Sequence, residues 1–227
     1  MIQHRSYSGQ LFRPKPEIFT SDDNKFIIVA TPWGNRAAAR KTVEIASDYL
    51  STFFRDPEAT SPFPKQADLS ENSNAIQVAA LLANDSLLKN ENKDEYKAGV
   101  ELFIASIHGE EVAYLQVGFP QVLLVRKDKT PLPIGIHFDL SMENLDKTKS
   151  LHPLPDEYIG LTTVPRFHVQ SFKRHKDDQL LMISHSWISK KVYQTKSESF
   201  TTDSITHALS QENPDQPFWV GVWDLKG

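Results

Sequence analysis

The sequence has no cysteine, only 9 glycines among 227 residues, and no excess of positive charge. Without cysteine the chain forms no disulfide, no thiolate nucleophile and no sulfur-ligated zinc or iron site. Its 25 basic and 29 acidic side chains give a net charge of −4, and basic residues form no run longer than a pair. Because binding to a phosphate backbone requires a concentrated basic surface, nucleic acid is excluded as a partner.

Long apolar stretches are also missing. No stretch approaches the roughly 18 residues of a membrane-spanning helix, and the N-terminus lacks the apolar core of a secretory signal. We therefore expect a cytoplasmic protein with no membrane partner. A chain of this length, with 39% hydrophobic residues, buries enough surface to fold without a structural metal or a disulfide, so we expect a single domain over residues 1–227.

The N-terminal half predicts one buried strand followed by two helices. Phe26–Ala30 is a short apolar run rich in β-branched residues, which is typical of a buried strand. Apolar residues then recur every three or four positions, which predicts a helix over about 36–54 with Asn35 as its N-cap. The same spacing predicts the inner face of a second helix at Ile76, Ala79, Ala83 and Leu87. The polar segment 89–97 is expected to be solvated loop.

The remainder of the chain is rich in predicted strands. Val100–Ile107 and Val112–Val117 flank a turn and Val122–Arg126 follows, so these three segments predict an antiparallel meander. Further elements are expected at Phe167–Phe172, Gln179–Ile183 and Phe218–Trp223, as strands, and at about Thr201–Gln211, as a helix. Regular alternation of strand and helix is lacking. The order therefore predicts an α+β protein in which helices pack outside antiparallel sheets.

Four segments, in order, resemble motifs of the metal-dependent protein serine/threonine phosphatases of type 2C. They are Val29–Asn35 before a long helix, Tyr114–Pro120, Asp178–Trp187, and Asp215–Gln216 before the last strand. The family has Val-Ala-Asp-Gly-x-Gly-Gly, Val-Gly-Asp-Ser, Asp-x-Leu-Leu-x-x-Ser-Asp-Gly and Asp-Asn at these places. The resemblance covers nearly the whole chain. It implies the family's four-layer αββα sandwich, with two antiparallel sheets face to face and helices on both outer faces.

In that family the chemistry depends on carboxylates. Two divalent cations, Mg or Mn, are bridged by an aspartate and held by further carboxylates and water, and they activate the attacking water. Carried onto this sequence, the bridging aspartate falls on Thr31 and the glycine after it on Pro32. The aspartates of the second and third motifs fall on Phe119 and His185. Asp215 alone keeps its family identity.

The family's N-terminal motif, Arg-x-x-Asn-Glu-Asp, fits the segment Arg13–Ile18. This alignment keeps Arg13 as a candidate phosphate-binding residue, keeps the motif's glutamate as Glu17 and puts Ile18 in place of a metal-ligating aspartate. One remaining carboxylate does not offset the dehydration of hard divalent cations. We therefore expect no catalytic residue, no metal site and no bound cofactor. We also hypothesise that His185 and Asp215, whose counterparts share a cation in the family, contact each other.

The resemblance, together with these replacements, implies a catalytically inactive phosphatase-like protein, a pseudophosphatase, that serves as a binding or regulatory module. Its expected partner is a protein, such as a phosphoprotein. Large apolar side chains stand at former motif positions, and Trp33, Phe119 and Trp187 would form a rim that faces the partner.

Two other interpretations remain open. The first is an active phosphatase whose Mg or Mn site is rebuilt from other residues. Its ligands would come from Glu17, Asp22, Asp23, His185 and Asp215. Asp22 and Asp23 also fit an ordinary turn before a strand. The second is an unrelated α+β domain for which the resemblance is fortuitous.

Overall fold

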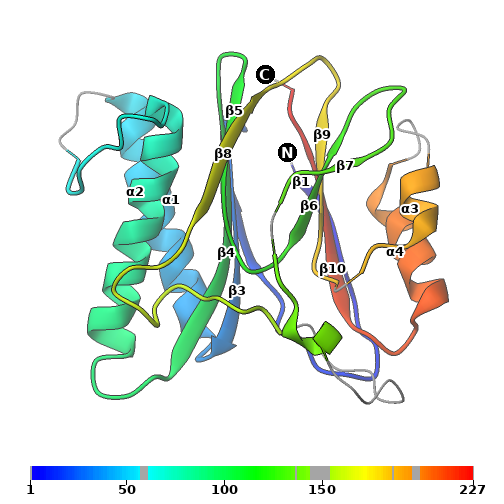
Figure 1. The fold of residues 1–227 in the computed structure, drawn as a ribbon, viewed down its shortest axis with the longest axis horizontal. Helices are drawn as coiled ribbons and strands as arrows, with labels where there is room; N and C mark the ends of the chain where they lie inside the picture. The colour runs from blue at the N-terminus through cyan, green and yellow to red at the C-terminus, as the bar shows by residue number, and fades with distance from the viewer. Residues whose placement is uncertain are drawn as a thin grey trace. The chain divides into compact units, whose positions relative to one another are not determined.

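The computed structural model describes residues 2–56, 61–135, 137–143, 154–185, 187–195 and 200–226. The chain forms two compact units, each built around its own antiparallel sheet of five strands (Figure 1). The first unit comprises residues 1–15, 119–156 and 174–226, and the second comprises residues 16–118 and 157–173. The single domain expected over residues 1–227 stays a prediction.

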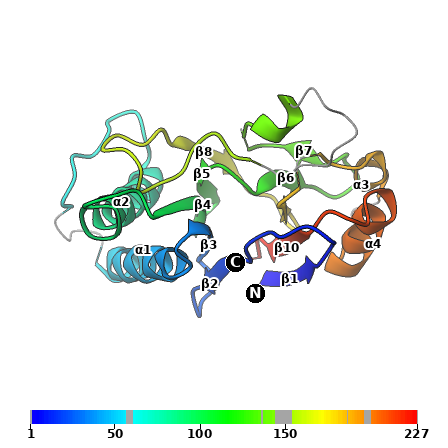
Figure 2. The ribbon, with the colours of Figure 1, turned by 90° about the horizontal axis from the view of Figure 1, so that it is seen from below.

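The second unit holds the longest helices. Its strands are β2 (Glu17–Thr20), β3 (Phe26–Gly34), β4 (Ala98–His108), β5 (Glu111–Val117) and β8 (His168–Lys173), paired in that order across the sheet. Its helices are α1 (Ala37–Arg55), α2 (Glu71–Ser86) and the π-helical turn η1 (Leu87–Glu91). Helices α1 and α2 lie side by side against one face of this sheet (Figure 2).

The core of the second unit follows the periodicity of the sequence. Alternate residues of β3 and β4 face the helices, among them Ile28 and Leu102. The expected inner face of α2 is confirmed, because Ile76, Ala79, Ala83 and Leu87 are all buried. Helix α1 begins at Ala37, and the Asn35 side chain accepts a hydrogen bond from the Ala37 backbone N–H at 3.0 Å. The predicted cap therefore serves the first turn, although Arg36 lies between it and the helix.

The first unit carries the other sheet. Its strands are β1 (Ile2–Tyr7), β6 (Gln121–Val125), β7 (Leu132–Pro133), β9 (Gln179–Ile183) and β10 (Phe218–Asp224), in the spatial order β1-β10-β9-β6-β7. Its helices are η2 (Leu140–Glu143), α3 (Lys190–Gln194) and α4 (Thr202–Glu212). Helix α4 starts with a reciprocal capping box between Thr201 and Ser204. Its inner residues Ile205 and Leu209 pack with Leu181 and Val220 of the sheet.

The predicted meander is wrong in its last step. β4 and β5 form the expected antiparallel hairpin, but Val122–Arg126 does not continue their sheet. Its strand, β6, instead pairs with β7 and β9 in the first unit. The physical reason is that the second edge of β5 is already occupied by β8, which arrives from much later in the chain. Proximity in the sequence therefore predicted the wrong partner for β6.

Most residues of the segment 89–97 are exposed, as its composition predicts, but Asn92 is an exception. Asn92 is buried, and its side-chain amide donates hydrogen bonds to the carbonyl oxygens of Ala98, at 2.7 Å, and Gly160, at 2.6 Å. Its amide oxygen accepts from the Lys97 and Ala98 N–H groups. One buried asparagine thus satisfies backbone groups that the turn leaves unpaired.

The expected fold class is confirmed: two antiparallel sheets are flanked by helices. In the part of the chain that the structure describes, no helix is both long enough and apolar enough to cross a membrane.

Candidate functional site

The first motif lies on β3 in the second unit. Thr31 and Pro32 are buried at its C-terminal end and stand opposite Glu101 and Val100 of β4. Neither Thr31 nor Pro32 carries a carboxylate, so neither can bridge two cations. The half-buried Trp33 follows, and its ring meets Tyr158 edge to face at 6.1 Å between centroids.

Sequence reasoning missed one acid beside this motif. Glu101 is fully buried on β4, directly opposite Thr31 in the antiparallel register. Directly paired residues point to the same face of a sheet, so a carboxylate stands one strand away from the position where the family has its bridging aspartate. The available signal was a lone acid inside the apolar run of Gly99–Ile107.

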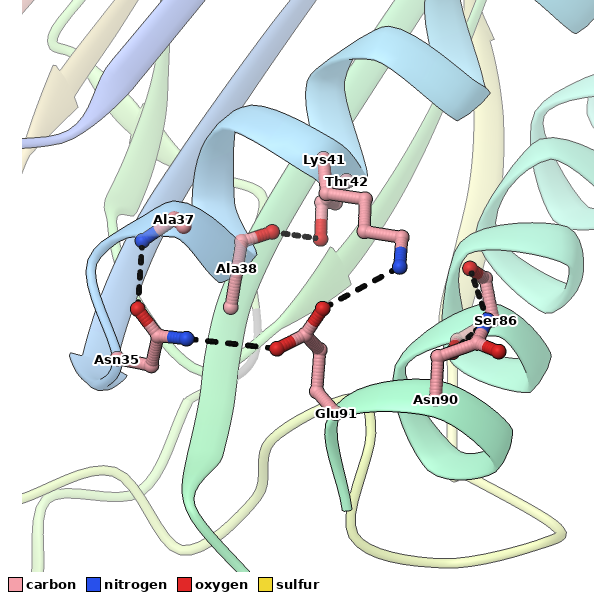
Figure 3. A network of polar contacts seen from close by, with 8 residues as sticks. All are labelled: Asn35, Ala37, Ala38, Lys41, Thr42, Ser86, Asn90 and Glu91. Atoms are coloured by element: carbon pink, nitrogen blue, oxygen red, sulfur yellow. Dashed lines mark hydrogen bonds and ion pairs between the residues drawn. The ribbon is translucent and has the colours of Figure 1, made fainter. Parts of the chain in front are cut away.

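A short polar network lies at the start of α1, directly after the motif (Figure 3). Gly34 has a φ of +81°, and a Cβ atom there would lie 2.1 Å from the Lys97 carbonyl oxygen, so only glycine fits. The side chain of the next residue, Asn35, donates to Glu91 at 3.3 Å, and the Lys41 ammonium reaches the other oxygen of Glu91 at 3.2 Å. These contacts fix the start of α1 against η1.

Among the residues in and after the N-terminal motif, Ile18 carries no ligand atom and Asp23 has ordinary structural partners. Ile18, which the resemblance aligns with a metal-ligating aspartate, lies on β2 opposite Val29. Asp23 accepts from the Ser21 hydroxyl at 2.8 Å and pairs with the Lys25 ammonium at 2.9 Å. Burial opposes ionisation of Asp23, but the hydrogen bonds from Lys25 and Ser21 outweigh it and lower the carboxyl pKa. Asp23 is therefore engaged as a turn acid.

His185 follows β9 in the first unit and is 1% exposed. The Gln121 side chain donates to its backbone carbonyl oxygen at 2.6 Å, and its Nδ1 atom lies 3.4 Å from the Trp187 backbone N–H, which can donate to it. The rings of Trp187 and Phe218 meet the imidazole edge to face. Burial lowers the His185 pKa to about 4, and the nearby charge of Arg13 acts in the same direction. The imidazole is therefore neutral at pH 7.

Arg13 and Phe119 are brought together in the same unit. The Arg13 guanidinium carbon lies 5.2 Å from the centroid of the Phe119 ring, within the range of a cation–π contact. Phe119 is only 1% exposed and its ring also packs against His137, with centroids 5.0 Å apart. Phe119 thus presents no surface to a partner, which corrects its expected place on the rim. Trp33 and Trp187 are half-buried and keep part of their surface exposed.

The hypothesised contact between His185 and Asp215 is not formed. The His185 Nδ1 atom faces the Trp187 N–H, and its Nε2 atom has no hydrogen-bond partner among the described residues. Asp215 is exposed and is held through its backbone, since its carbonyl oxygen accepts from the N–H groups of Gln10, at 2.8 Å, and Leu11, at 3.2 Å. A buried neutral imidazole and a solvated carboxylate have little to gain from each other.

The donor set does not fit two hard divalent cations. Mg and Mn prefer several carboxylate and water oxygens, whereas the positions that the resemblance aligns with metal ligands carry isoleucine, threonine, proline, phenylalanine and histidine, besides Asp215. Within the described ranges, no three histidine, aspartate or glutamate side chains gather as a metal site would require. Asp215 is the one carboxylate at the positions so aligned.

No protein-family model matches the sequence, and no curated protein matches it. Solved structures, however, match over its full length. The Mycobacterium tuberculosis serine/threonine phosphatase PstP/Ppp aligns with a TM-score of 0.68 at 14% identity, over 100% of this chain and 99% of that one. MsPP, a PPM Ser-Thr phosphatase from Mycobacterium smegmatis in complex with cacodylate, gives 0.69 at 13% identity, over 100% and 98%. PppA of Pseudomonas aeruginosa, a regulatory component of its T6SS, gives 0.62 at 17%, over 99% and 98%.

These likenesses show that the chain has the fold of PPM-type serine/threonine phosphatases. At such low identities the fold alone is shared, so any conclusion about activity depends on the residues of the site.

Proposed function

We propose that this chain keeps the phosphatase fold as a protein-binding module and does not hydrolyse phosphate esters. One observation carries the proposal: apart from Asp215, every position that corresponds to a metal ligand of the phosphatases lacks a carboxylate. Cation-assisted displacement at phosphorus requires carboxylate oxygens to hold the metal ions, and this chain supplies too few of them.

The surroundings of His185 support the same conclusion. A neutral imidazole offers one nitrogen to a metal, and at this position Nδ1 faces the Trp187 N–H instead. Hard cations prefer oxygen ligands, so His185 is a poor replacement for an aspartate. Its burial among the aromatic rings of Trp187 and Phe218 favours a packing role.

Arg13 gives a second line of support. In the resemblance it corresponds to the phosphate-binding arginine, but here it is 8% exposed and its guanidinium lies over the Phe119 ring. A guanidinium committed to an internal aromatic contact is less available to a phosphate in solution.

The first test is hydrolysis of p-nitrophenyl phosphate and of a phosphothreonine peptide, with and without manganese. The catalytic domain of PstP, whose structure has been solved with two manganese ions, is the positive control. We expect no manganese-dependent turnover by this chain. Turnover that requires manganese and is abolished by Asp215→Ala would establish the alternative, an active phosphatase with a rebuilt metal site.

The second test separates metal binding from turnover. A cation that binds only the folded state, at a hundred times its Kd, raises stability by about 2.7 kcal/mol. In a chain of this size such a gain raises Tm by roughly 5–10 °C. We expect millimolar magnesium or manganese to leave Tm unchanged, whereas the PstP catalytic domain should be stabilised. A clear rise for this chain would contradict the proposal even if no substrate were hydrolysed.

The proposed partner is a protein, and a phosphoprotein fits a fold whose relatives act on phosphorylated serine and threonine. The half-buried tryptophans Trp33 and Trp187 are the proposed contact residues, because aromatic side chains contribute strongly to protein interfaces. The test is fluorescence anisotropy with phosphorylated and unphosphorylated forms of the same peptides. Binding should weaken in Trp33→Ala or Trp187→Ala, and Tyr96→Ala, at an exposed loop residue, is the matched control.

A further inference from the structure

The three central strands of the first unit define two opposite ends of its sheet. β6 and β9 are antiparallel, as are β9 and β10, so Val125 pairs with Gln179 and Gln179 pairs with Asp224 at one end. The motif residues Phe119 and His185 lie at the other end, before β6 and after β9. The end marked by Gln179 therefore lies away from the positions that the resemblance aligns with the phosphatase site.

Two turns with the same hydrogen bond lie at this end. Arg126–Lys129 follows β6 and His175–Asp178 precedes β9, and in each turn the N–H of the fourth residue donates to the carbonyl oxygen of the first at 3.2 Å. The third residue of each turn is an aspartate with a positive φ, a conformation that aspartate tolerates. A lysine stands second in both turns, so Lys127 and Lys176 occupy equivalent positions.

The buried Asp178 joins the two turns to each other and to the segment after β10. Its carboxylate, which is 1% exposed, accepts from the Arg126 Nε atom at 3.1 Å and from the His175 N–H at 2.8 Å. Its backbone carbonyl oxygen accepts from the Leu225 N–H at 3.0 Å. The Arg174 guanidinium donates to the Leu225 carbonyl oxygen at 2.6 Å. Because the three segments are held together in the free protein, a partner that binds them has little conformational entropy to remove.

Four exposed lysines lie on these three segments, and together they are called the basic surface. They are Lys127, Lys129, Lys176 and Lys226. None of the four has an ion-pair partner among the described residues. The neighbouring Lys173 is not counted, because it is paired with Glu110 at 2.8 Å. The half-buried and buried charges of the same segments cancel, and against the exposed Asp128 and Asp177 the four lysines leave a net charge of +2, whereas the whole chain carries −4.

The basic surface fits an acidic peptide better than a long polyanion. Opposite charges steer the encounter of two proteins and fix their register. Asp128 and Asp177 stand beside the lysines in the turns, so a continuous row of phosphates would meet repulsion as well as attraction. A peptide with a few spaced acids can pair with the lysines and avoid the aspartates. The acidic net charge of the whole chain also disfavours nucleic acid and anionic membranes.

We propose that the basic surface docks an acidic segment of the protein partner, whose carboxylates or phosphorylated side chains pair with the four lysines. This inference rests on the proposed function as a protein-binding module, and it adds the chemistry of the bound segment and the place where it binds. Docking here requires neither a metal ion nor any residue at the positions aligned with the phosphatase site.

The test is fluorescence anisotropy of the full chain with two labelled peptides, one with spaced glutamates and one with phosphoserines at the same spacing. Binding of both peptides means that negative charge is recognised, and binding of the phosphorylated one alone means that phosphate is recognised. Either result supports the proposal. Raising the salt concentration from about 50 to about 200 mM should weaken binding severalfold, because exposed charges are screened.

Charge reversal at the two turns locates the binding surface. Lys127→Glu combined with Lys176→Glu should weaken binding about tenfold. Lys93→Glu combined with Lys190→Glu, at exposed positions outside the basic surface, changes the net charge equally and should bind like the unchanged chain. Unchanged thermal unfolding of both double variants shows that their folding is intact.

Three results would overturn the docking proposal. The first is that neither acidic peptide binds at low salt. The second is an equal loss of binding in the two double variants, because net charge alone would then explain it. The third is tighter binding of a single-stranded oligonucleotide that carries the same charge as the peptides. Hydrolysis of the phosphorylated peptide with manganese would instead contradict the proposed function, whereas the glutamate peptide has no phosphate to lose and tests the basic surface alone.

Discussion

The Arg13 guanidinium lies over the ring of Phe119, 5.2 Å from its centroid. In the resemblance, Arg13 corresponds to the phosphate-binding arginine of the phosphatases and Phe119 to an aspartate. In this chain the arginine contacts an aromatic face. Because Phe119 is 1% exposed and Arg13 is 8% exposed, the contact belongs to internal packing.

The contact itself can be measured in a double-mutant cycle. Phe119→Ala should cost about 3–5 kcal/mol in the free energy of unfolding, as large-to-small changes in a core do. Arg13→Ala should cost about 1–2 kcal/mol through lost packing of its stem and charge. The two should couple by about 1 kcal/mol. Urea denaturation gives the free energy of unfolding of the unchanged chain, the two single variants and the double variant. The control combines Arg13→Ala with Ile76→Ala, from the core of the second unit, and there the two losses of unfolding free energy should add. If the losses of Arg13→Ala and Phe119→Ala also add, the contact contributes nothing.

His185 should make stability depend on pH between about 6.5 and 4. Its folded-state pKa is lowered to about 4, below the ordinary value of 6.5, so the unfolded chain takes up a proton first as the pH falls. The stability present above pH 6.5 should decline progressively, by about 3 kcal/mol at pH 4. Burial also lowers the pKa of His137, which adds a loss of the same sign.

Replacement isolates the contribution of His185. In His185→Gln the loss of unfolding free energy between pH 7 and pH 4 should be smaller than in the unchanged chain, by about 3 kcal/mol. Identical profiles for His185→Gln and the unchanged chain would mean that His185 is not the titrating group.

Gly9 should not tolerate a side chain. A Cβ atom there would lie 2.2 Å from the Asp215 carbonyl oxygen, which is backbone and which also accepts hydrogen bonds from Gln10 and Leu11. Gly9→Ala should therefore force the two segments apart and cost about 1–3 kcal/mol in urea denaturation. Gly109→Ala is the comparison: no atom lies within 4 Å of the new Cβ, but its φ of +58° should cost about 1 kcal/mol. A smaller loss at Gly9 than at Gly109 would contradict the close approach.

The Asn35 network should stabilise the start of α1 mainly through the cap. Asn35→Ala removes the acceptor for the Ala37 N–H and should cost about 1 kcal/mol. Glu91→Ala leaves the cap in place and removes a partly exposed ion pair with Lys41 and a long hydrogen bond from Asn35, so it should cost less than about 1 kcal/mol.

Asn35→Asp distinguishes the two contributions. It keeps the cap acceptor but places a second carboxylate beside Glu91, so its cost should shrink as salt screens the repulsion. A loss of stability that does not change with salt concentration would argue against this arrangement.

Local patterns in the sequence predicted many of the helices and strands. The spacing of Ile76, Ala79, Ala83 and Leu87 predicted the buried face of α2, and the apolar run from Phe26 predicted β3. Periodicity reports which side of an element is buried, so helices and central strands are recognised well. Edge strands such as β1 and β2 are half exposed and have little apolar pattern, and they were not predicted.

Strand partners and buried polar residues were harder to predict from the sequence. β6 follows β5 in the chain but joins the other sheet, and Asn92 lies in a polar stretch yet is buried. Pairing depends on which distant strand competes for an edge, and a polar residue is buried where backbone groups need a partner. Local composition gives no information about either condition.

The sequence by itself determined the chemistry available at the former motif positions, because residue type alone decides whether an oxygen anion exists to bind a cation. Only the tertiary structure decided how those side chains are used: Arg13 against Phe119, His185 among aromatic rings, and Glu101 opposite Thr31. Contacts of this kind join residues far apart in the chain, and their geometry follows from packing and strand register rather than from any local pattern.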